Sequence, residues 1–273
     1  MKKGLIIGNS HVAMLAKSWR IKATDFANMK LEFFAQPGDG PKGIAFKNST
    51  MYAADPELQK FLVSSGAKKN VNLNDFDFLV IVACGLSIYH AVSVALNYHV
   101  WAWPSSHQAI AQEIPFGDVQ LVSAGCLHST LLNALENTLG ASLTKTLRSI
   151  TSIPIFIITQ PLPSEKLSKM KNKGHNFHKT VQYGTNEQIY QAFQAAITDV
   201  FSSVPQSTVI FQPCETIQSN IYTRQKFTTG AVRLYNLDKK QNSTDTLHAN
   251  ERYGALILTK LYENITNLSK ISK

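Results

Sequence analysis

The sequence predicts an α/β domain in which a parallel five-stranded sheet is covered by helices on both faces. Short apolar runs typical of buried strands alternate along the chain with helical patterns, which is the order expected for a parallel sheet with crossover helices. The chain has 273 residues, of which 44% are hydrophobic and 16% charged. This composition supports a large core and excludes disorder as a description of the whole chain.

Five apolar runs are predicted as the strands of this sheet. The first ends at a glycine turn that begins at Gly8, and the second is closed by the glycine-rich loop Pro37–Gly43. The third is almost continuously apolar, as expected for a strand that is buried on both faces. The fourth is ended by Pro161 and Pro163, and the fifth by Pro213. In chain order the predicted strands are Lys3–Ile7, Leu31–Ala35, Phe76–Cys84, Ile153–Thr159 and Thr208–Gln212.

Helical patterns fill the gaps between the strands. The segment of residues 86–149 is too long for a simple crossover, and it contains an aromatic cluster and four histidines: Tyr89, Tyr98, Trp101, Trp103, His90, His99, His107 and His128. We interpret it as a helical insertion and as a candidate lid over the site. A second irregular stretch, Thr216–Thr244, precedes the last helix. In chain order the predicted helices are Ala13–Arg20, Glu57–Val63, His128–Leu139, Glu187–Phe201 and Ala249–Thr266.

The formal net charge is +9, from 27 Lys and Arg against 18 Asp and Glu, so a nucleic-acid partner has to be considered. Basic clusters lie at Lys166–Lys173 and at the C-terminus (Lys270, Lys273). No RNA-binding aromatic motif, helix-turn-helix signature or zinc knuckle accompanies them. We therefore expect no nucleic-acid partner, and we interpret the charge as a basic surface suited to an acidic glycan or an anionic membrane face.

The sequence features that bear on location favour the cytoplasm. No stretch approaches the roughly 20 apolar residues that span a bilayer, so no stable membrane insertion is expected. The N-terminus begins like a signal peptide, but its apolar run stops at Ile7, well short of the roughly 7–15 apolar residues of a secretory segment. The cysteines Cys84, Cys126 and Cys214 are odd in number and widely spaced, which is typical of reduced thiols in a reducing compartment.

The clearest chemical signal is the tetrapeptide GNSH at Gly8–His11, directly after the first predicted strand. Ligands of open parallel sheets bind beyond the carboxyl ends of the strands. A serine at that edge, just before a helix, can expose its hydroxyl and direct its N–H into the same crevice. Ser10 therefore has the position of a nucleophile with a built-in oxyanion donor, or that of a helix N-cap.

A second motif, DTLH at Asp245–His248, stands before the last predicted helix. A nucleophilic serine needs a base that takes its proton, and a basic histidine needs a group that orients it. An aspartate three residues before a histidine can reach one ring nitrogen while the other faces the serine. Together the two motifs predict that Ser10, His248 and Asp245 act as one unit.

The two motifs resemble the end blocks of the SGNH (GDSL-like) hydrolases. In this sequence the blocks read IIGNSH at Ile6–His11, with Asn9 in place of the usual aspartate, and DTLH at Asp245–His248. The alternation of strands and helices between them also fits, so the resemblance spans nearly the whole chain. It implies one domain over residues 1–273, a three-layer α/β/α sandwich with a flavodoxin-like five-stranded sheet, a Ser10–His248–Asp245 triad, and no cofactor.

The two middle blocks of that family supply oxyanion donors. The resemblance places the second-block glycine at Gly38, with Gly40 as the reserve, and the third-block glycine at Gly85. Ser87 stands where the family has an asparagine, so one side-chain donor is missing. Losing one such donor typically costs about 10²–10³ in rate. The expected oxyanion donors are therefore the N–H groups of Ser10, Gly38 and Gly85.

Other residues are weaker candidates for substrate binding. Gln160 and Gln212 end two strands at the same edge, and Trp101 and Trp103 could stack on a sugar. His11 is expected to brace the loop of the nucleophile, and Glu215 is interpreted as a solvated carboxylate. The histidine spacings, including His175 and His178, do not match a metal motif, so no metal is expected.

These features predict a serine esterase or deacylase that hydrolyses a carboxylic ester, with acetyl as the expected acyl group, on a carbohydrate or another small acylated substrate. An O-acyltransferase acting on a surface-polysaccharide precursor would use the same residues. A non-catalytic binding protein that keeps the fold is a third reading, which the missing asparagine favours and the intact Ser10, His248 and Asp245 disfavour. The sequence indicates no particular oligomeric state.

Overall fold

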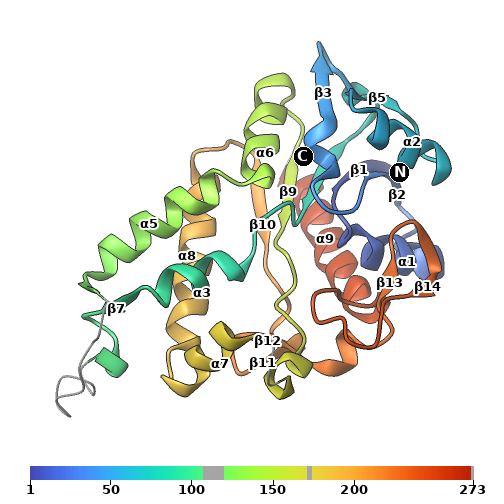
Figure 1. Cartoon of the computed structure of the whole chain (residues 1–273). Coiled ribbons are helices and arrows are strands. Elements are labelled where there is room, and N and C mark those ends of the chain that lie inside the picture. The colour runs from blue at the N-terminus through green and yellow to red at the C-terminus, as the bar shows by residue number, and fades with distance from the viewer. Residues whose placement is uncertain (107–119, 171–173, 272–273) are drawn as a thin grey trace.

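The structure is a computed structural model of the chain, and it describes residues 1–106, 120–170 and 174–271 (Figure 1). His107, the end of the basic cluster at 171–173 and Lys273 lie outside these residues. The helices are α1 (Val12–Lys22), α2 (Pro56–Ser64), α3 (Ile88–Ala95), α5 (Ala124–Glu136), α6 (Leu139–Ile150), α7 (His175–Gln182), α8 (Asn186–Ser202) and α9 (Glu251–Ile271).

The five predicted strands form one sheet in the order β10-β9-β6-β1-β2, and every neighbouring pair is parallel. This confirms the predicted fold class, an α/β fold with a five-stranded all-parallel sheet flanked by helices. The strands are β1 (Lys2–Gly8), β2 (Met29–Ala35), β6 (Phe78–Val82), β9 (Ile155–Ile158) and β10 (Ser207–Ile210). The chain leaves β1 toward β2 on one side and later returns to pair β6 on the other, so β1 lies at the switch point where such sheets bind ligands.

Alternate residues of β1 pack into two separate cores, one on each face of the sheet. Leu5 and Ile7 belong to the larger core, which α3, α5, α6 and α8 share, whereas Ile6 belongs to the core formed with α1 and α9. Both faces are therefore covered, which is why the strands are apolar almost throughout.

One helix predicted from the sequence is wrong in its bounds. The pattern over His128–Leu139 is divided between α5, which ends at Glu136, and α6, which begins at Leu139. The helical conformation is interrupted at Thr138, whose backbone is extended. The Thr138 hydroxyl caps α6 by accepting a hydrogen bond from the Ala141 N–H. A capping threonine in an apolar stretch looks like helix interior when only periodicity is considered.

The sequence also did not predict the smaller elements. An antiparallel sheet of β3 (Ile44–Lys47), β4 (Thr50–Ala53) and β5 (Asn70–Asn72) follows the loop after β2. Three two-stranded pairs join β7 (Tyr98–Val100) with β8 (Gln120–Val122), β11 (Ile217–Gln218) with β12 (Tyr222–Thr223), and β13 (Val232–Arg233) with β14 (Asn236–Lys240). These runs of two to five residues are too short for a hydrophobic period to be visible.

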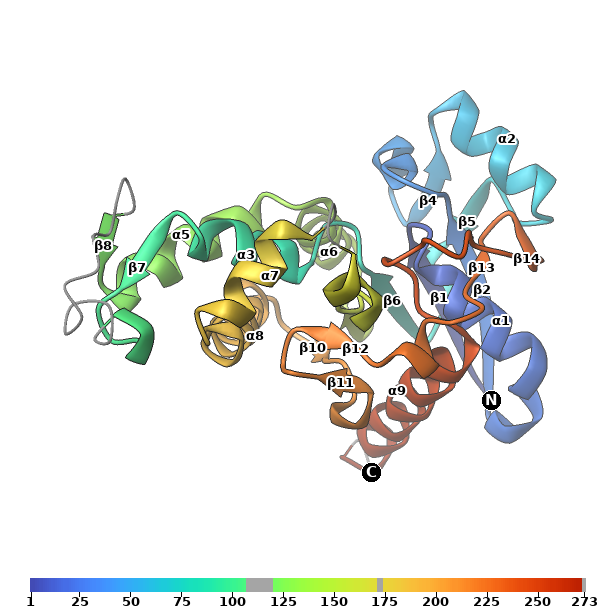
Figure 2. The same ribbon diagram turned by 60° about the horizontal axis from the view of Figure 1, so that its bottom comes forward.

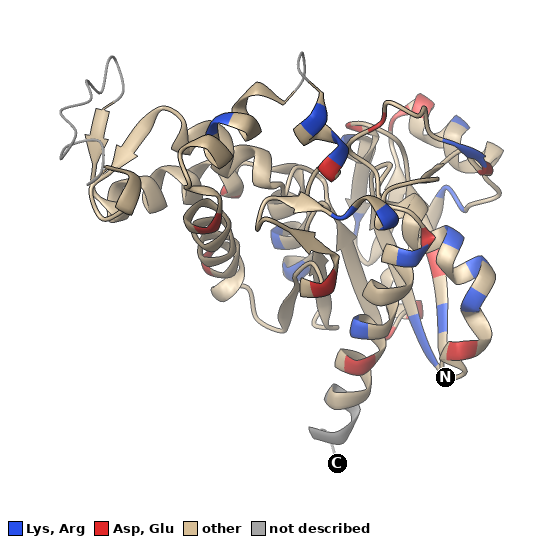
Figure 3. Ribbon diagram, turned by 90° about the horizontal axis from the view of Figure 1, so that it is seen from below, with Lys and Arg blue, Asp and Glu red and all other residues tan. Residues whose placement is uncertain are grey.

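The segment that was interpreted as a helical insertion contains α3, β7, β8, α5 and α6. Its outer part, from α3 to α5, projects sideways from the sheet, with β7 and β8 at its far end (Figures 1 and 2). Residues 86–106 and 120–135 contain no Asp, Glu, Lys or Arg, so the ribbon of these two ranges is tan throughout in Figure 3. Across the described chain, no helix has the length and apolar character needed to cross a membrane.

Gly254 sets the distance between α9 and α1. A Cβ at this position would lie 2.2 Å from the carbonyl oxygen of Met14, closer than any normal contact. We expect Gly254→Ala to lower the free energy of unfolding by about 1–3 kcal/mol, because the two helices must separate. Urea unfolding measures this change.

Gly125→Ala is the matched control for that variant. Gly125 lies in the first turn of α5, where a Cβ would meet only the Ser123 hydroxyl, at 3.8 Å. This variant should be as stable as the wild type or slightly more stable. Equal stability of the two variants would contradict the close approach of α9 to α1.

Candidate active site

Ser10 lies at the carboxyl end of β1, in the turn that leads into α1. β1 ends at Gly8, where a Cβ would approach the Val82 carbonyl oxygen to 2.6 Å, so the turn passes close to β6. The Val12 N–H donates to the Asn9 carbonyl (3.0 Å), and the Asn9 side chain accepts from the His11 N–H (3.2 Å). Asn9 thus braces this turn with its side chain.

The loop before α9 brings His248 to Ser10. The Nε2 atom of His248 lies 3.0 Å from the Ser10 Oγ, and its Nδ1 atom lies 3.0 Å from the Asp245 Oδ1. The Asp245 carboxylate also accepts hydrogen bonds from the backbone N–H groups of His248 (3.2 Å) and Leu247 (3.4 Å). The side chains of His248 and Asp245 each expose 16% of their surface. The three residues of the two end motifs are therefore in one hydrogen-bonded line.

The pKa of Asp245 is lowered from its ordinary value. Burial alone would raise it, but the hydrogen bond and charge of His248, together with the two backbone N–H groups, outweigh that effect. Asp245 is thus a carboxylate at neutral pH, the form that can hold the Nδ1–H of His248.

The DTLH loop is held by neighbours whose roles the sequence reasoning missed. Asn250 donates from its amide to the carbonyls of Lys226 (2.9 Å) and Thr229 (2.8 Å), and its Oδ1 accepts from the first turn of α9. On the other side, the Ser164 N–H donates to the Thr246 carbonyl (2.8 Å). An asparagine just before a helix is a typical capping signal, and it was the one clue in the sequence to this support.

Three backbone N–H groups are candidates for the oxyanion site, those of Ser10, Gly38 and Gly85. Among the described residues, no backbone carbonyl accepts a hydrogen bond from any of the three. The N–H of Gly40, in contrast, donates to the Pro37 carbonyl (3.3 Å), so it is already occupied. Gly38 is thus the better of the two second-block candidates.

The loop that carries Gly85 has an unusual backbone. The predicted strand over Phe76–Cys84 stops at Val82, because Ala83, Cys84 and Gly85 all have positive φ, at 59°, 49° and 87°. This conformation costs about 1–2 kcal/mol for each residue that has a Cβ. Bonds from the Ala83 N–H to Ile158 and from the Gly140 N–H to Cys84 hold it in place. Such strain is concentrated at functional sites.

Ser87, which stands at the position of the missing asparagine, caps a helix. Its side chain is buried, and its Oγ accepts from the Tyr89 N–H (3.4 Å) at the start of α3. The sequence placed Tyr89 in the aromatic cluster of the long segment but gave it no individual role at the site. Burial, with a contribution from the Asp245 charge, raises its pKa to about 12, and its ring packs edge-on against Phe177 at 4.8 Å. Tyr89 is therefore a neutral phenol close enough to Asp245 to feel its charge.

His11 is buried directly beside the line of three residues. Its ring stacks on the ring of His248, with centroids 4.9 Å apart and an interplanar angle of 26°. It exposes 6% of its surface, and its Nδ1 atom is buried without a hydrogen-bond partner. Burial, and then the neighbouring His248, lower the pKa of His11 to about 3. The sequence predicted that His11 stabilises the loop of Ser10. It did not predict that His11 stacks on His248.

The weaker substrate-binding candidates have different surroundings. Gln212 is buried, and both ends of its amide are hydrogen-bonded inside the protein. Its Oε1 accepts from the Leu162 N–H (2.9 Å), and its Nε2 donates to the Thr223 hydroxyl (3.0 Å). Gln160 is half-buried, and its N–H donates to the Leu86 carbonyl (2.9 Å), joining the loops after β6 and β9. Gln212 therefore serves to connect loops, whereas Gln160 keeps a position at the sheet edge.

The two tryptophans follow β7, at the far end of the projecting segment. Trp103 packs against the larger core, and Trp101 exposes 57% of its surface. β7, which directly precedes the two tryptophans in the chain, lies far from β1 in both views (Figures 1 and 2), a separation that was not foreseen. The aromatic character of Trp101 and Trp103 does not by itself tell where the long segment that contains them lies relative to Ser10.

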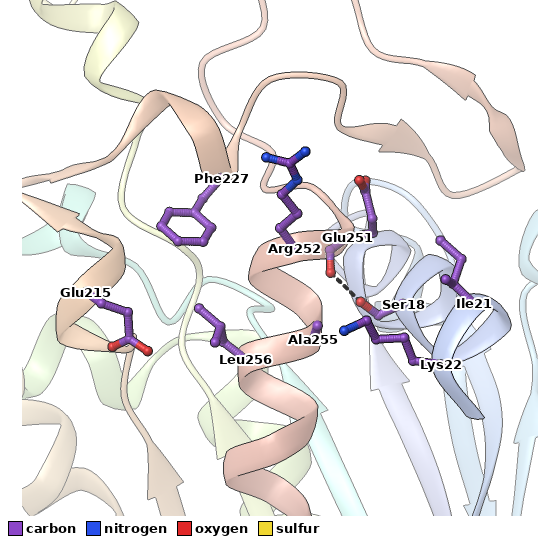
Figure 4. A pocket seen from close by; sticks show the side chains of 9 residues that line it. All are labelled: Ser18, Ile21, Lys22, Glu215, Phe227, Glu251, Arg252, Ala255 and Leu256. Atoms are coloured by element: carbon purple, nitrogen blue, oxygen red, sulfur yellow. Dashed lines mark hydrogen bonds between the residues drawn. The ribbon is translucent and has the colours of Figure 1, made fainter. Parts of the chain in front are cut away.

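A separate cleft of about 310 Å³ lies beside α1 and α9. Phe227, Ala255 and Leu256 give it apolar walls, and Glu215, predicted as a solvated carboxylate, lies at one side (Figure 4). The Ser18 hydroxyl donates to the Glu251 carbonyl between the two helices. The residues of the end motifs do not line this cleft. Among the described residues, no group of three His, Cys, Asp or Glu side chains could hold a metal ion.

Comparison with protein-family models and with curated protein sequences finds no match for this chain. Among solved structures, a gut microbial diltiazem-metabolizing enzyme is 10% identical with a TM-score of 0.32, over 76% of this chain and 36% of that one. A lipase from a goat rumen metagenome is 10% identical with a TM-score of 0.33, over 83% of this chain and 91% of that one. The chain thus spans about a third of the first protein's length. Likenesses this distant carry no argument about function.

Proposed function

We propose that this chain is a serine esterase of the SGNH type, with Ser10 as nucleophile, His248 as base and Asp245 as the residue that orients His248. The observation that supports this most is that His248 bridges the other two side chains at 3.0 Å on each side. This is the geometry that proton transfer from a serine requires.

In the first half of the reaction, the Ser10 Oγ attacks the acyl carbonyl while His248 Nε2 takes the hydroxyl proton. The Asp245 carboxylate stabilises the positive charge that develops on His248. His248 then gives the proton to the departing alcohol oxygen, and the acyl group stays on Ser10. In the second half, a water molecule loses a proton to His248 and attacks the acyl carbonyl. The bond between the acyl carbon and the Ser10 Oγ then breaks, His248 returns the proton to Oγ, and the carboxylic acid is released.

The tetrahedral intermediates carry a negative oxygen that needs donors. We assign this role to the N–H groups of Ser10, Gly38 and Gly85. Within the described chain, none of these three groups donates to a backbone carbonyl. The asparagine of the resembling family is replaced by Ser87, whose hydroxyl caps α3. With one donor fewer, turnover about 10²–10³ times slower than in a complete site is expected.

The proposed substrate is a carboxylic ester, with acetyl as the acyl group, on a carbohydrate or another small molecule. The resemblance of the end motifs supports this class. An acidic glycan also fits the charge distribution. A cleft of about 690 Å³ reaches Asn250, two residues beyond His248, and Lys17, Lys226, Lys240 and Arg252 line it with Asp238 and Glu251.

The test is to react the purified protein with p-nitrophenyl acetate and, separately, with a fluorophosphonate. We expect a burst of nitrophenol equal to the enzyme concentration and one phosphonyl group per chain, which peptide mass spectrometry places on Ser10. Absence of both would rule out the proposed reaction. A label on another serine would rule out Ser10 as the nucleophile.

A further inference from the structure

The two hydrogen bonds of His248 leave one motion of its ring free. The two bonds act at different ring nitrogens, Nδ1 toward Asp245 and Nε2 toward Ser10, each at 3.0 Å. Rotation about the line through these nitrogens would tilt the ring while changing the two distances little. Hydrogen bonds weaken as their angles depart from linearity, so such a tilt would reduce proton transfer. A contact on the ring face is needed to prevent it.

His11 supplies that contact. Its ring lies on the face of His248 at 4.9 Å with an interplanar angle of 26°, an arrangement typical of stacked aromatic pairs. The position of His11 is itself restricted, because its backbone N–H is bound by Asn9 and its side chain is buried. The stack therefore joins the nucleophile's own turn to the base.

The chemical state of His11 suits this role. The charged groups that act on His11 are His248 and Asp245, and Asp245 already holds the Nδ1 of His248. Nothing in the described chain bonds the buried Nδ1 of His11, and burial keeps its pKa at about 3, so the ring is neutral at neutral pH. A neutral ring does not repel the positive charge that His248 acquires.

We propose that His11 is a positioning residue, whose neutral ring holds the plane of His248 in line with Ser10 and Asp245. The inference rests on the proposed esterase function. It predicts that an aromatic ring at position 11 is what the site needs, whereas the imidazole nitrogens of His11 are not required.

The test compares His11→Phe with His11→Leu and His11→Gln. Phenylalanine keeps a flat ring at this position, whereas leucine and glutamine remove it. We expect kcat for p-nitrophenyl acetate to fall about 10–100-fold in the leucine and glutamine variants with KM nearly unchanged, because a misaligned base slows the chemical step. The phenylalanine variant should recover most of kcat. His128→Leu, which alters a remote histidine on α5, is the matched control.

A spectroscopic readout separates the inference from the function on which it rests. The Nδ1–H proton of His248, held by Asp245, should give a low-field proton resonance in the wild type and in His11→Phe. It should be broadened or lost in His11→Leu, with thermal unfolding showing that each variant is folded. Equal kcat in all variants, or equal losses in the phenylalanine and leucine variants, would overturn the positioning role. Wild-type protein with the resonance but no Ser10 labelling would overturn the esterase function and leave the role in orienting the ring standing.

Discussion

Replacing Ser10 with alanine is expected to lower ester hydrolysis about 10⁴-fold or more. Without the hydroxyl no acyl-enzyme can form, and His248 has no proton to take at the 3.0 Å contact. The rate with p-nitrophenyl acetate and the stoichiometry of fluorophosphonate labelling measure the loss. Residual activity would come from the oxyanion donors and substrate binding alone.

A double variant makes this prediction sharper. Side chains that act as one unit in catalysis are strongly non-additive, so Ser10→Ala with His248→Ala should be no slower than Ser10→Ala alone. Ser93→Ala, at an exposed serine of α3, is the control and should match the wild type. If the loss of rate in the double variant equalled the product of the losses in the two single variants, Ser10 and His248 would not act in the same step.

The second large effect is expected for Asp245→Asn, with about a 10⁴-fold loss of kcat. The amide has nearly the same shape, but it can donate to His248 Nδ1 and so favour the tautomer that cannot take the Ser10 proton. The exposed pair of His128 and Asp199, at 2.9 Å, provides the matched control. Asp199→Asn changes the same kind of contact away from Ser10 and should leave kcat unchanged.

The same variant has a predicted pH signature in its stability. The pKa of Asp245 is lower in the folded chain than its ordinary value, so the ionised carboxylate stabilises the fold at neutral pH. This contribution is lost as the pH falls through the lowered pKa. The difference in unfolding midpoint between wild type and Asp245→Asn should therefore be largest near neutral pH and should shrink below about pH 4. A difference that is constant with pH would contradict the assigned ionisation.

The basic charge of the chain has a different distribution from the one that the total suggests. The net charge of +9 is that of the whole chain, but residues 86–106 and 120–135 contain no Asp, Glu, Lys or Arg, so the basic side chains all lie outside these ranges. An acidic substrate would therefore meet the cleft near Lys226 and Lys240. The projecting segment with Trp101 at its end lacks the side chains that attract an anion.

The sequence by itself determined the strands of the sheet and the two motifs of the candidate site. Strands buried on both faces appear in the sequence as continuous apolar runs. The motifs GNSH and DTLH were recognised from their positions along the chain, after the first strand and before the last helix. The parallel sheet then brings these motifs to one edge. Local pattern and topology were sufficient for this part of the structure.

Only the tertiary structure decided which side chains surround Ser10. The stack of His11 on His248, the internal bonds of Gln212 and the distance of the tryptophans from β1 all depend on contacts between residues far apart in the chain. Such contacts follow from how whole helices and loops pack, and no local period or spacing encodes them. The two motifs of the candidate site were thus visible in the sequence, whereas the contacts around His248 became visible only in the folded chain.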